Sequence, residues 1–379
     1  MINHKIVLED TTLRDGEQTP GLFFTKEEKL LIHNKLVEAG VKWIEAGIPA
    51  MGGEEVEYLK MLVAQGSDAT LIAWNRGILE DVEFSLKLGF KAIHIGLPTS
   101  EIHLKNSIGK DKVWLLSRAK ELIDYAKSKG AFVSISSEDV GRTDRSFLQE
   151  YAGIVFEAGA DRLRLSDTIG ILTPEQYGEI VKSVVSSCPI PVQCHTHNDY
   201  GLALANLLSG LNAGATYFHV TVNGIGERAG MTDLAQAYMV LKNLYGIDLG
   251  LNGTKLSALS SLVEELSGIK MPPWCPIVGS NVFAHESGIH VNGMLHNSNT
   301  FEPFDPSQVG GSRKYVLGKH SGRALIAFIL YNHNMYYDDS ILRMCLSEVR
   351  SISIKQKKPL SNEELFEIYY KIKPTNATN

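Results

Sequence analysis

Two histidines separated by one residue, His195 and His197, have the clearest chemical potential in this sequence. They lie in PVQCHTHNDYG (191–201), where an apolar run predicts a strand that ends near Asp199. Side chains two apart on a strand point to the same side, so both imidazoles should project together. An isolated His-x-His is more often a pair of unrelated polar residues at a loop edge. Two neutral imidazoles plus one carboxylate, however, form a common divalent-metal site.

The carboxylate that we expect to complete such a site is Asp15, in the segment DTTLRDGEQTPG (10–21). A lone Asp beside a glycine is usually a turn residue, and only its pairing with two strand-end histidines favours metal ligation. The neighbouring Arg14 would supply a fixed cation for an oxyanion that develops on a carbonyl. Arg14 could instead form a structural ion pair with Asp10 or Glu17, and this alternative stays open.

Further polar residues follow other predicted strands. Glu138 ends one of them, and Arg142 could anchor a substrate carboxylate through a bidentate contact or pair with Asp139 in the loop. Thr168 could hydrogen-bond a carboxylate or cap a helix. A later segment, AHESGIHVNGMLH, carries three histidines for which a role in acid–base chemistry is expected, namely His285, His290 and His296.

The elements that must position these residues alternate between short β-rich runs and helical patterns up to about residue 245. Eight strands are predicted, at 6–10, 43–48, 70–75, 92–98, 132–139, 162–167, 191–199 and 218–224. Most of the helix-like stretches between them end in Gly, a usual helix stop. This order predicts a (β/α)8 barrel rather than an open doubly wound sheet. No GxGxxG follows the first strand, which disfavours a dinucleotide-binding sheet.

Such a barrel would bring the polar residues together, because active sites of this fold lie at the carboxyl ends of the strands. Polar residues follow six of the predicted strands, at Asp10 to Glu17, Asn75 and Arg76, Glu138 and Asp139, Asp167 and Thr168, His195 to Asp199, and Asn223 to Arg228. These segments are far apart in the sequence but should converge on one mouth. This convergence makes the metal site a strong prediction.

The alternation fades after about residue 250. We therefore expect a catalytic barrel over 1–250 and a smaller, mainly helical subdomain over 251–379 that covers the active site. The apolar surface of such an appendage favours a homodimer.

The composition is that of an ordinary globular protein, with 379 residues, 44% hydrophobic and 21% charged. A net charge of −6 and the lack of a long Lys/Arg block argue against nucleic-acid binding. No apolar run is long enough to predict a membrane span, and the first residues do not resemble a signal peptide. Four cysteines without a CxxC pair indicate neither a disulfide framework nor a cysteine zinc site. We expect a cytoplasmic setting.

Several motifs together resemble those of the isopropylmalate/homocitrate synthase family. They are DTTLRDGEQTPG (10–21), SSEDVGR (136–142), SDTIG (166–170), HTHND (195–199), NGIGERAG (223–230) and FAHESGIHVNG (283–293). The segments GIPAMGGEE (47–55), AWNR (73–76) and LPTSEIHLKNSIGKD (97–111) look most like the nitrogen-fixation type of homocitrate synthase. The resemblance implies a metal-dependent acyltransferase on a (β/α)8 barrel. The chain length leads us to expect no leucine-sensing domain.

The resemblance also implies roles for individual residues. Asp15, His195 and His197 match the ligands of a divalent metal (Mg²⁺, Mn²⁺ or Zn²⁺), and Arg14 matches the arginine that polarises the carbonyl. Glu138 and His290 match the acid–base residues. The expected substrate contacts are Arg14, Arg76, Arg142 and Thr168, and the residues expected near the acyl-CoA are Gly226, Glu227, Arg228 and Tyr315. Lys105 is a further cation that could lie near the mouth.

One position departs from the family pattern. Isopropylmalate synthases and many of their relatives have an Asn after GERAG that is assigned to the metal, although some homocitrate synthases lack it. This chain has Met231 there, which suits a hard cation poorly. We therefore expect three protein ligands, with substrate and water completing the metal's coordination.

The implied reaction is a Claisen-type condensation of acetyl-CoA with an α-keto acid, expected to be 2-oxoglutarate, to give homocitrate and CoA. Pyruvate, oxaloacetate, 2-oxoisovalerate and phosphonopyruvate are alternative acceptors. Two other classes remain open. They are a carbon–carbon lyase of the hydroxymethylglutaryl-CoA type, against which the HESGIH segment argues, and a non-catalytic barrel, which the intact metal and acid–base residues disfavour.

Overall fold

The computed structural model describes residues 2–373, and the chain divides after Met271 into two compact units. This boundary lies later than the one expected after residue 250, because α10 (Leu256–Ser267) packs against α1 (Lys26–Glu38) in the first unit. The loss of the strand–helix alternation in the sequence therefore marks the end of the barrel strands, not the end of the unit.

The first unit is the predicted (β/α)8 barrel. Eight parallel strands close in chain order, with β8 paired to β1. The strands are β1 (Val7–Asp10), β2 (Trp43–Gly47), β3 (Thr70–Arg76), β4 (Ala92–Gly96), β5 (Phe132–Glu138), β6 (Arg162–Asp167), β7 (Val192–Thr196) and β8 (Tyr217–Val220). Every predicted strand is present, although β7 ends at Thr196 and not near Asp199, and β8 ends at Val220 and not at residue 224.

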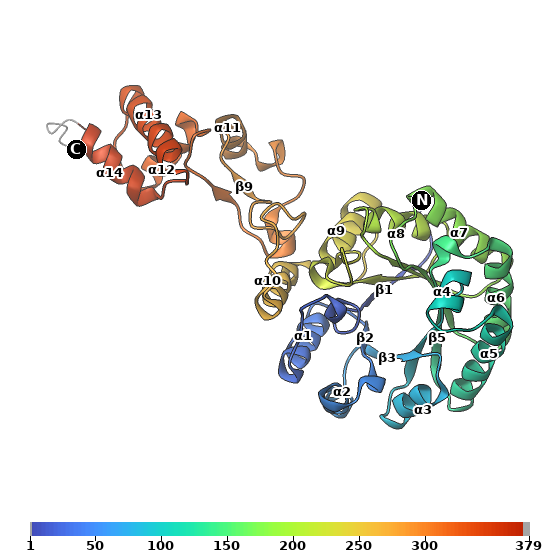
Figure 1. Ribbon diagram of the computed structural model, residues 1–379. Helices are drawn as coiled ribbons and strands as arrows, with labels where there is room; N and C mark the ends of the chain where they lie inside the picture. The colour runs from blue at the N-terminus through green and yellow to red at the C-terminus, as the bar shows by residue number, and fades with distance from the viewer. Residues whose placement is uncertain (1, 374–379) are drawn as a thin grey trace. The chain divides into compact units, whose positions relative to one another are not determined.

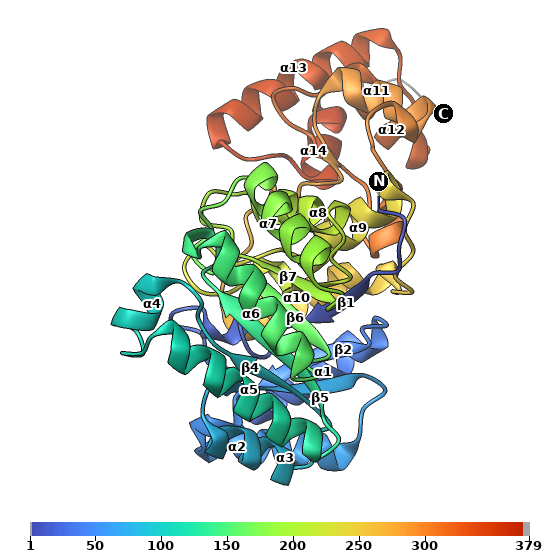
Figure 2. The same cartoon turned by 90° about the vertical axis from the view of Figure 1, so that its right-hand side faces the viewer.

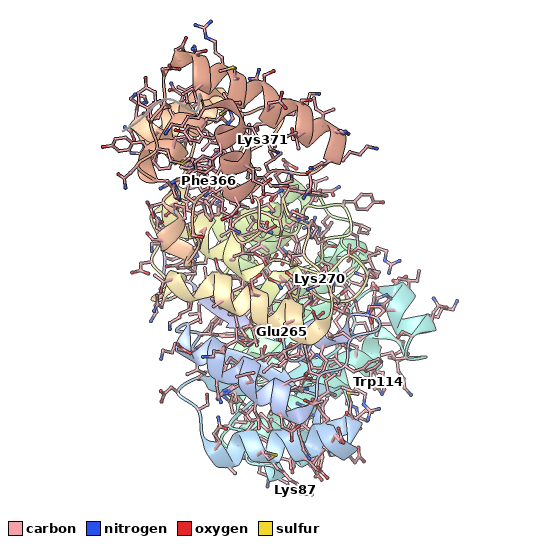
Figure 3. All side chains as sticks on the ribbon, turned by 90° about the vertical axis from the view of Figure 1, so that its left-hand side faces the viewer. Lys87, Trp114, Glu265, Lys270, Phe366 and Lys371 are labelled. Carbon is pink, nitrogen blue, oxygen red and sulfur yellow. The ribbon has the colours of Figure 1, made fainter. Side chains whose placement is uncertain are left out.

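Helices form a ring outside the strands (Figures 1 and 2). Besides α1 and α10 they are α2 (Gly53–Gln65), α3 (Leu79–Lys87), α5 (Lys112–Ser128), α6 (Arg145–Glu157), α7 (Pro174–Ser187), α8 (Ala203–Asn212) and α9 (Leu234–Tyr245). The short α4 (Glu101–Asn106) lies between β4 and α5 in the chain. Local sequence explains where several begin, since Thr25 with Glu28 and Thr173 with Gln176 form capping boxes. Lys87 and Lys270, labelled in Figure 3, are exposed to solvent.

Alternation along the strands separates apolar from polar side chains. In β6, Leu163 and Leu165 are buried, and Arg162 and Arg164 alternate with them. The two arginines contact polar and aromatic groups of several other strands, which places them inside the barrel. Residues i and i+2 of a strand share one face, so the same alternation puts Glu9, Glu45 and His219 in this interior.

The second unit is mainly helical, as expected. Its helices are α11 (Gly288–His296), α12 (Arg323–Asn332), α13 (Asp339–Gln356) and α14 (Asn362–Ile372), and the short strands β9 (Ala284–His285) and β10 (Lys314–Tyr315) pair in parallel. Buried side chains of all four helices form one apolar core, which includes Val291, Leu330, Val349 and Leu365. No helix within residues 2–373 is long and apolar enough to span a membrane.

Candidate active site

A cavity of about 200 Å³ lies at the carboxyl ends of the barrel strands. All of its lining residues belong to the first unit, and most are polar or charged: Arg14, Asp15, Gln18, Trp74, His94, Ser136, Glu138, Arg164, Ser166, Thr168, His195, His197, Glu227 and Arg228. The set comes from strands distant in sequence and includes members of five of the six polar segments expected to converge. Asn75 and Arg76, the polar residues expected from the third strand, do not line this cavity.

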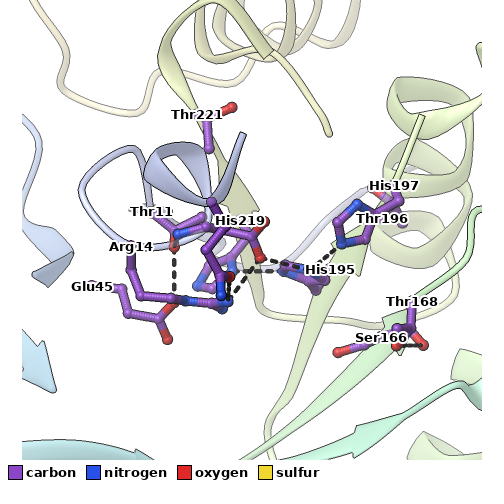
Figure 4. A network of polar contacts seen from close by, with 12 residues as sticks. Thr11, Arg14, Glu45, Ser166, Thr168, His195, Thr196, His197, His219 and Thr221 are labelled. Carbon is purple, nitrogen blue, oxygen red and sulfur yellow. Dashed lines mark hydrogen bonds and ion pairs between the residues drawn. The ribbon is translucent and has the colours of Figure 1, made fainter. Parts of the chain in front are cut away.

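Asp15, His195 and His197 meet in this cavity, and Figure 4 shows His195 between His197 and His219. Nε2 of His195 lies 3.1 Å from Nε2 of His197 and 3.4 Å from Oδ2 of Asp15. All three side chains are buried, and each offers a donor atom within 4.8 Å of the others. Oδ1 of Asp15 and Nδ1 of His197 have no hydrogen-bond partner among the described residues.

This donor set fits a divalent cation. Buried polar atoms without a partner are uncommon and call for an explanation such as a bound ion. Burial, with the neighbouring His197 and His219, lowers the pKa of His195 well below its usual value. The imidazole is therefore neutral at pH 7, which is the form that binds metals.

Arg14 is fixed by carboxylates, but not by those considered from the sequence. Its Nε donates to Oε2 of Glu45 at 2.5 Å, and its Nη1 lies 2.9 Å from Oδ2 of Asp15. Asp10 instead accepts from the backbone N–H and the hydroxyl of Thr12. The Glu45 contact holds the guanidinium at the cavity wall, beside the predicted metal ligand.

Glu138 ends β5 and lines the cavity, where its Oε1 accepts a long hydrogen bond of 3.4 Å from the hydroxyl of Ser136. Burial raises the pKa of this carboxyl, and the nearby Arg14 opposes the shift in part. Glu138 therefore keeps a proton to a higher pH than an ordinary glutamic acid. A buried carboxyl group with a raised pKa can act as a general acid or base.

The loop after β8 supplies a second wall. Glu227 and Arg228 line the cavity, and a Cβ on Gly226 would lie 3.4 Å from Oδ1 of Asp15, so this backbone approaches the predicted metal ligand closely. Arg228 is held by Asp199 at 2.8 Å and donates to the carbonyl of Thr168. Thr168 accepts from the N–H of Asp139.

Arg76 and Arg142 are not among the residues that line this cavity. Asp81 accepts two hydrogen bonds from Arg76, at 2.7 and 2.9 Å. Asp139 accepts from Nε of Arg142 at 2.8 Å, which is the loop ion pair considered from the sequence. Lys105 is likewise not a lining residue. The substrate contacts expected of these cations stay predictions.

His290 and Tyr315 belong to the second unit. His290 is exposed there and stacks on Phe301 with the ring centroids 4.1 Å apart. Tyr315 packs edge-to-face against Phe328. The neighbouring His285 lies 3.3 Å from Glu302, which Arg313 also contacts.

Met231 is buried and pairs with His197 through an isolated antiparallel bridge. The position at which the family resemblance implies an Asn ligand therefore lies beside the predicted metal ligand His197. A thioether offers no hard oxygen donor, so the side chains that could hold the cation are Asp15, His195 and His197.

Sequence reasoning missed the charged residues beneath the site. Glu45 and Arg164 pair at 2.7 Å inside the barrel, and His219 lies 2.9 Å from His195. A signal was available, because RLRLSD (162–167) and WIEAG (43–47) place charged residues alternately with apolar ones in strands that are otherwise buried. In a strand covered by helices on its outer face, such residues can only point into the barrel.

Comparison with known proteins places two family models on the chain. The model described as HMGL-like matches residues 5–263, and the model described as homocitrate synthase post-HMGL domain-like matches residues 277–357.

Curated relatives cover nearly the whole chain. A 2-phosphonomethylmalate synthase of Streptomyces rubellomurinus is 60% identical over 98% of this chain and 99% of its own. A 2-isopropylmalate synthase of Caldanaerobacter subterraneus is 43% identical, over 96% and 95% of the two chains. Homocitrate synthase 1 of a Nostoc species is also 43% identical, over 96% and 97%. The solved HMG-CoA lyase of Bacillus subtilis superposes with a TM-score of 0.65 at 21% identity, over 71% and 95%, and shows the fold alone.

Proposed function

The chain belongs to the HMGL-like family, among its acetyl-CoA-dependent synthases, and from this premise we propose that it condenses acetyl-CoA with 3-phosphonopyruvate to give 2-phosphonomethylmalate and CoA. The observation that carries the choice of acceptor is the 60% identity, over nearly both full lengths, to a 2-phosphonomethylmalate synthase. The 2-oxoglutarate acceptor expected from the sequence becomes the second candidate, which the 43% identity to a homocitrate synthase supports.

The cavity supports an acceptor with a second polar or anionic group. Three hydroxyl side chains line it, from Ser136, Ser166 and Thr168, together with the cations Arg14 and Arg164. The isopropyl group of 2-oxoisovalerate can accept no hydrogen bond from these hydroxyl groups or cations. A phosphonate or carboxylate can accept hydrogen bonds from them, so 2-oxoisovalerate is disfavoured as the acceptor.

We propose Asp15, His195 and His197 as the protein ligands of the divalent metal. When bound there, the metal would act as a Lewis acid on the keto and carboxylate oxygens of the acceptor. Arg14, held by Glu45, would place a positive charge beside the same keto oxygen and stabilise the negative charge that develops on it.

The remaining chemistry is proton transfer and carbon–carbon bond formation. We propose that His290 takes a proton from the methyl group of acetyl-CoA, and that the resulting enolate carbon attacks the keto carbon. Glu138, which lines the cavity and whose pKa is raised by burial, would give a proton to the keto oxygen as that oxygen becomes a hydroxyl. Water then hydrolyses the thioester and releases CoA.

Release of the CoA thiol from acetyl-CoA, measured with each acceptor in turn, tests this function. We expect kcat/KM with phosphonopyruvate to exceed that with 2-oxoglutarate, pyruvate, oxaloacetate or 2-oxoisovalerate by about tenfold or more. Phosphorus NMR of the product should show a phosphonate that has gained a carboxymethyl group.

Two controls accompany this measurement. Reactions without an acceptor measure background thioester hydrolysis, and Arg14→Gln should lose turnover with every acceptor. Preferred turnover of 2-oxoglutarate would assign a homocitrate synthase in place of the proposed function, and no turnover with any α-keto acid would contradict the reaction class.

A further inference from the structure

We propose that His219 and Glu9 form a positioning pair behind His195, which fixes the proton of that imidazole on Nδ1 and leaves Nε2 free for the metal. This inference rests on the ligand set proposed above. Neither His219 nor Glu9 lines the cavity, and both are fully buried beneath it.

The three side chains form one continuous line of contacts. Oε1 of Glu9 lies 2.6 Å from Nε2 of His219, and Nδ1 of His219 lies 2.9 Å from Nδ1 of His195. Nε2 of His195 then points to the other predicted ligands, at 3.1 Å from His197 and 3.4 Å from Asp15. Figure 4 shows the histidines of this line, with His219 and His197 on opposite sides of His195.

One assignment of protons satisfies every contact in the line. The carboxylate of Glu9, 2.7 Å from Nη1 of Arg162, is an acceptor, so Nε2 of His219 must carry a hydrogen and donate it. A neutral His219 then has a lone pair on Nδ1 and accepts from Nδ1–H of His195. A neutral His195 has its remaining lone pair on Nε2, the atom that faces Asp15 and His197. Metal-binding histidines are generally oriented in this way, by a partner of the second ring nitrogen.

The barrel backbone holds the pair in place. Glu9 in β1 and His219 in β8 are register partners of adjacent parallel strands, and β8 also pairs with β7, which carries His195. Three neighbouring strands thus fix the three side chains. A site on strands keeps its geometry more closely than one on loops.

The same carboxylates do not form a second metal site, although Glu9, Glu45 and His219 have donor atoms within 4.8 Å of one another. Arg162 already lies 2.7 Å from Glu9, and Arg164 lies 2.7 Å from Glu45. These two buried cations neutralise the two carboxylates. A divalent cation added there would place excess positive charge in the buried interior.

Metal binding by the full-length protein tests the inference without relying on turnover. His219→Phe removes the acceptor for Nδ1–H of His195 while keeping a ring in the space, and we expect about 10- to 100-fold weaker Mn²⁺ binding by calorimetry. Glu9→Gln keeps an acceptor oxygen for the His219 N–H and should lose less. Ser134→Ala is the matched control, since Ser134 bonds to Arg162 and His94 in the same interior, and it should bind Mn²⁺ like the wild type.

The outcomes separate this inference from the function it rests on. Wild-type Mn²⁺ affinity in His219→Phe would overturn the positioning pair alone. If His197→Ala binds Mn²⁺ as tightly as the wild type, the proposed ligand set is wrong, and the positioning pair falls with it.

A second measurement on the unmutated protein does not depend on whether the variants fold. In ¹⁵N-histidine-labelled protein loaded with Zn²⁺, NMR should show His195 protonated on Nδ1 and metal-bound through Nε2. A proton on Nε2 of His195 in that sample would contradict the proposal.

Discussion

At the scale of single residues, buried carboxyl groups of the barrel unit differ widely in pKa. Burial favours the neutral form of Glu9, but Arg162, His219 and Arg164 together outweigh it and lower its pKa to about 2. Asp233 has no such cation beside it. Burial raises its pKa to about 6, against the opposing effect of the backbone N–H groups that it accepts from at the start of α9. The charge state of a buried carboxyl therefore follows from its partners.

Asp233 gives a pH-dependent prediction. Its pKa is raised from the ordinary 3.8 to about 6, so between these values the folded protein keeps a proton that the unfolded chain releases. Its contribution to the free energy of unfolding is therefore present below about pH 4 and is lost as the pH rises through 6. An Asn at this position can still cap the helix but cannot ionise. Asp233→Asn should therefore not show this fall in the free energy of unfolding, which amounts to at most about 3 kcal/mol at pH 7.5.

Urea unfolding of both proteins at pH 4.5 and 7.5 measures the difference. If the free energy of unfolding falls equally in the wild type and the variant between pH 4.5 and 7.5, a raised pKa of Asp233 is not the cause.

At the scale of elements, the site depends on how closely helices approach the strands that carry it. In α8, Gly210 lies against β7, and a Cβ there would lie 2.5 Å from Sγ of Cys194 and 2.8 Å from the ring of Tyr177. Cys194 precedes His195 and points outward to this helix, as expected from strand alternation. The absence of a side chain at Gly210 therefore allows α8 to lie close to β7, the strand that carries the proposed metal ligand His195.

We predict that Gly210→Ala destabilises the protein by about 1–3 kcal/mol, because the added methyl group overpacks the interface between α8 and β7. Displacement of β7 should also weaken Mn²⁺ binding, which calorimetry would measure.

Gly153→Ala in α6 is the matched control, since a Cβ at Gly153 meets nothing within 4 Å. It should stabilise the protein by about 0.5–1 kcal/mol, as alanine does in a helix. If both substitutions have the same effect on stability, close approach at Gly210 is not the cause.

At the scale of the whole molecule, the proposed chemistry draws on both compact units. The proposed metal ligands, Arg14 and Glu138 belong to the barrel unit, whereas the proposed base His290 belongs to the helical unit. The homodimer expected from the sequence stays a prediction.

This division predicts that metal binding and turnover can be separated. His290→Gln should lower kcat by about 10²- to 10⁴-fold, as expected for the loss of an acid–base group, while Mn²⁺ affinity stays at the wild-type value. Thiol-release kinetics and calorimetry on the same sample measure both.

His333→Gln is the control, since it changes a histidine of the same unit that packs on Phe366. A His290→Gln variant with full turnover would rule out His290 as the base.

The sequence by itself determined the barrel and the residues that are proposed as metal ligands. Strand alternation and helix stops are local properties, so eight strands could be placed to within a few residues, and the order of elements then implied that Asp15, His195 and His197 converge. The pairing of ionised groups was decided only by the tertiary structure. Arg142 pairs with Asp139, whereas Arg14 pairs with Glu45 from another strand and His195 contacts His219 from the next one. Such choices depend on which side chains the closed barrel brings within hydrogen-bond distance, and no local pattern encodes that distance.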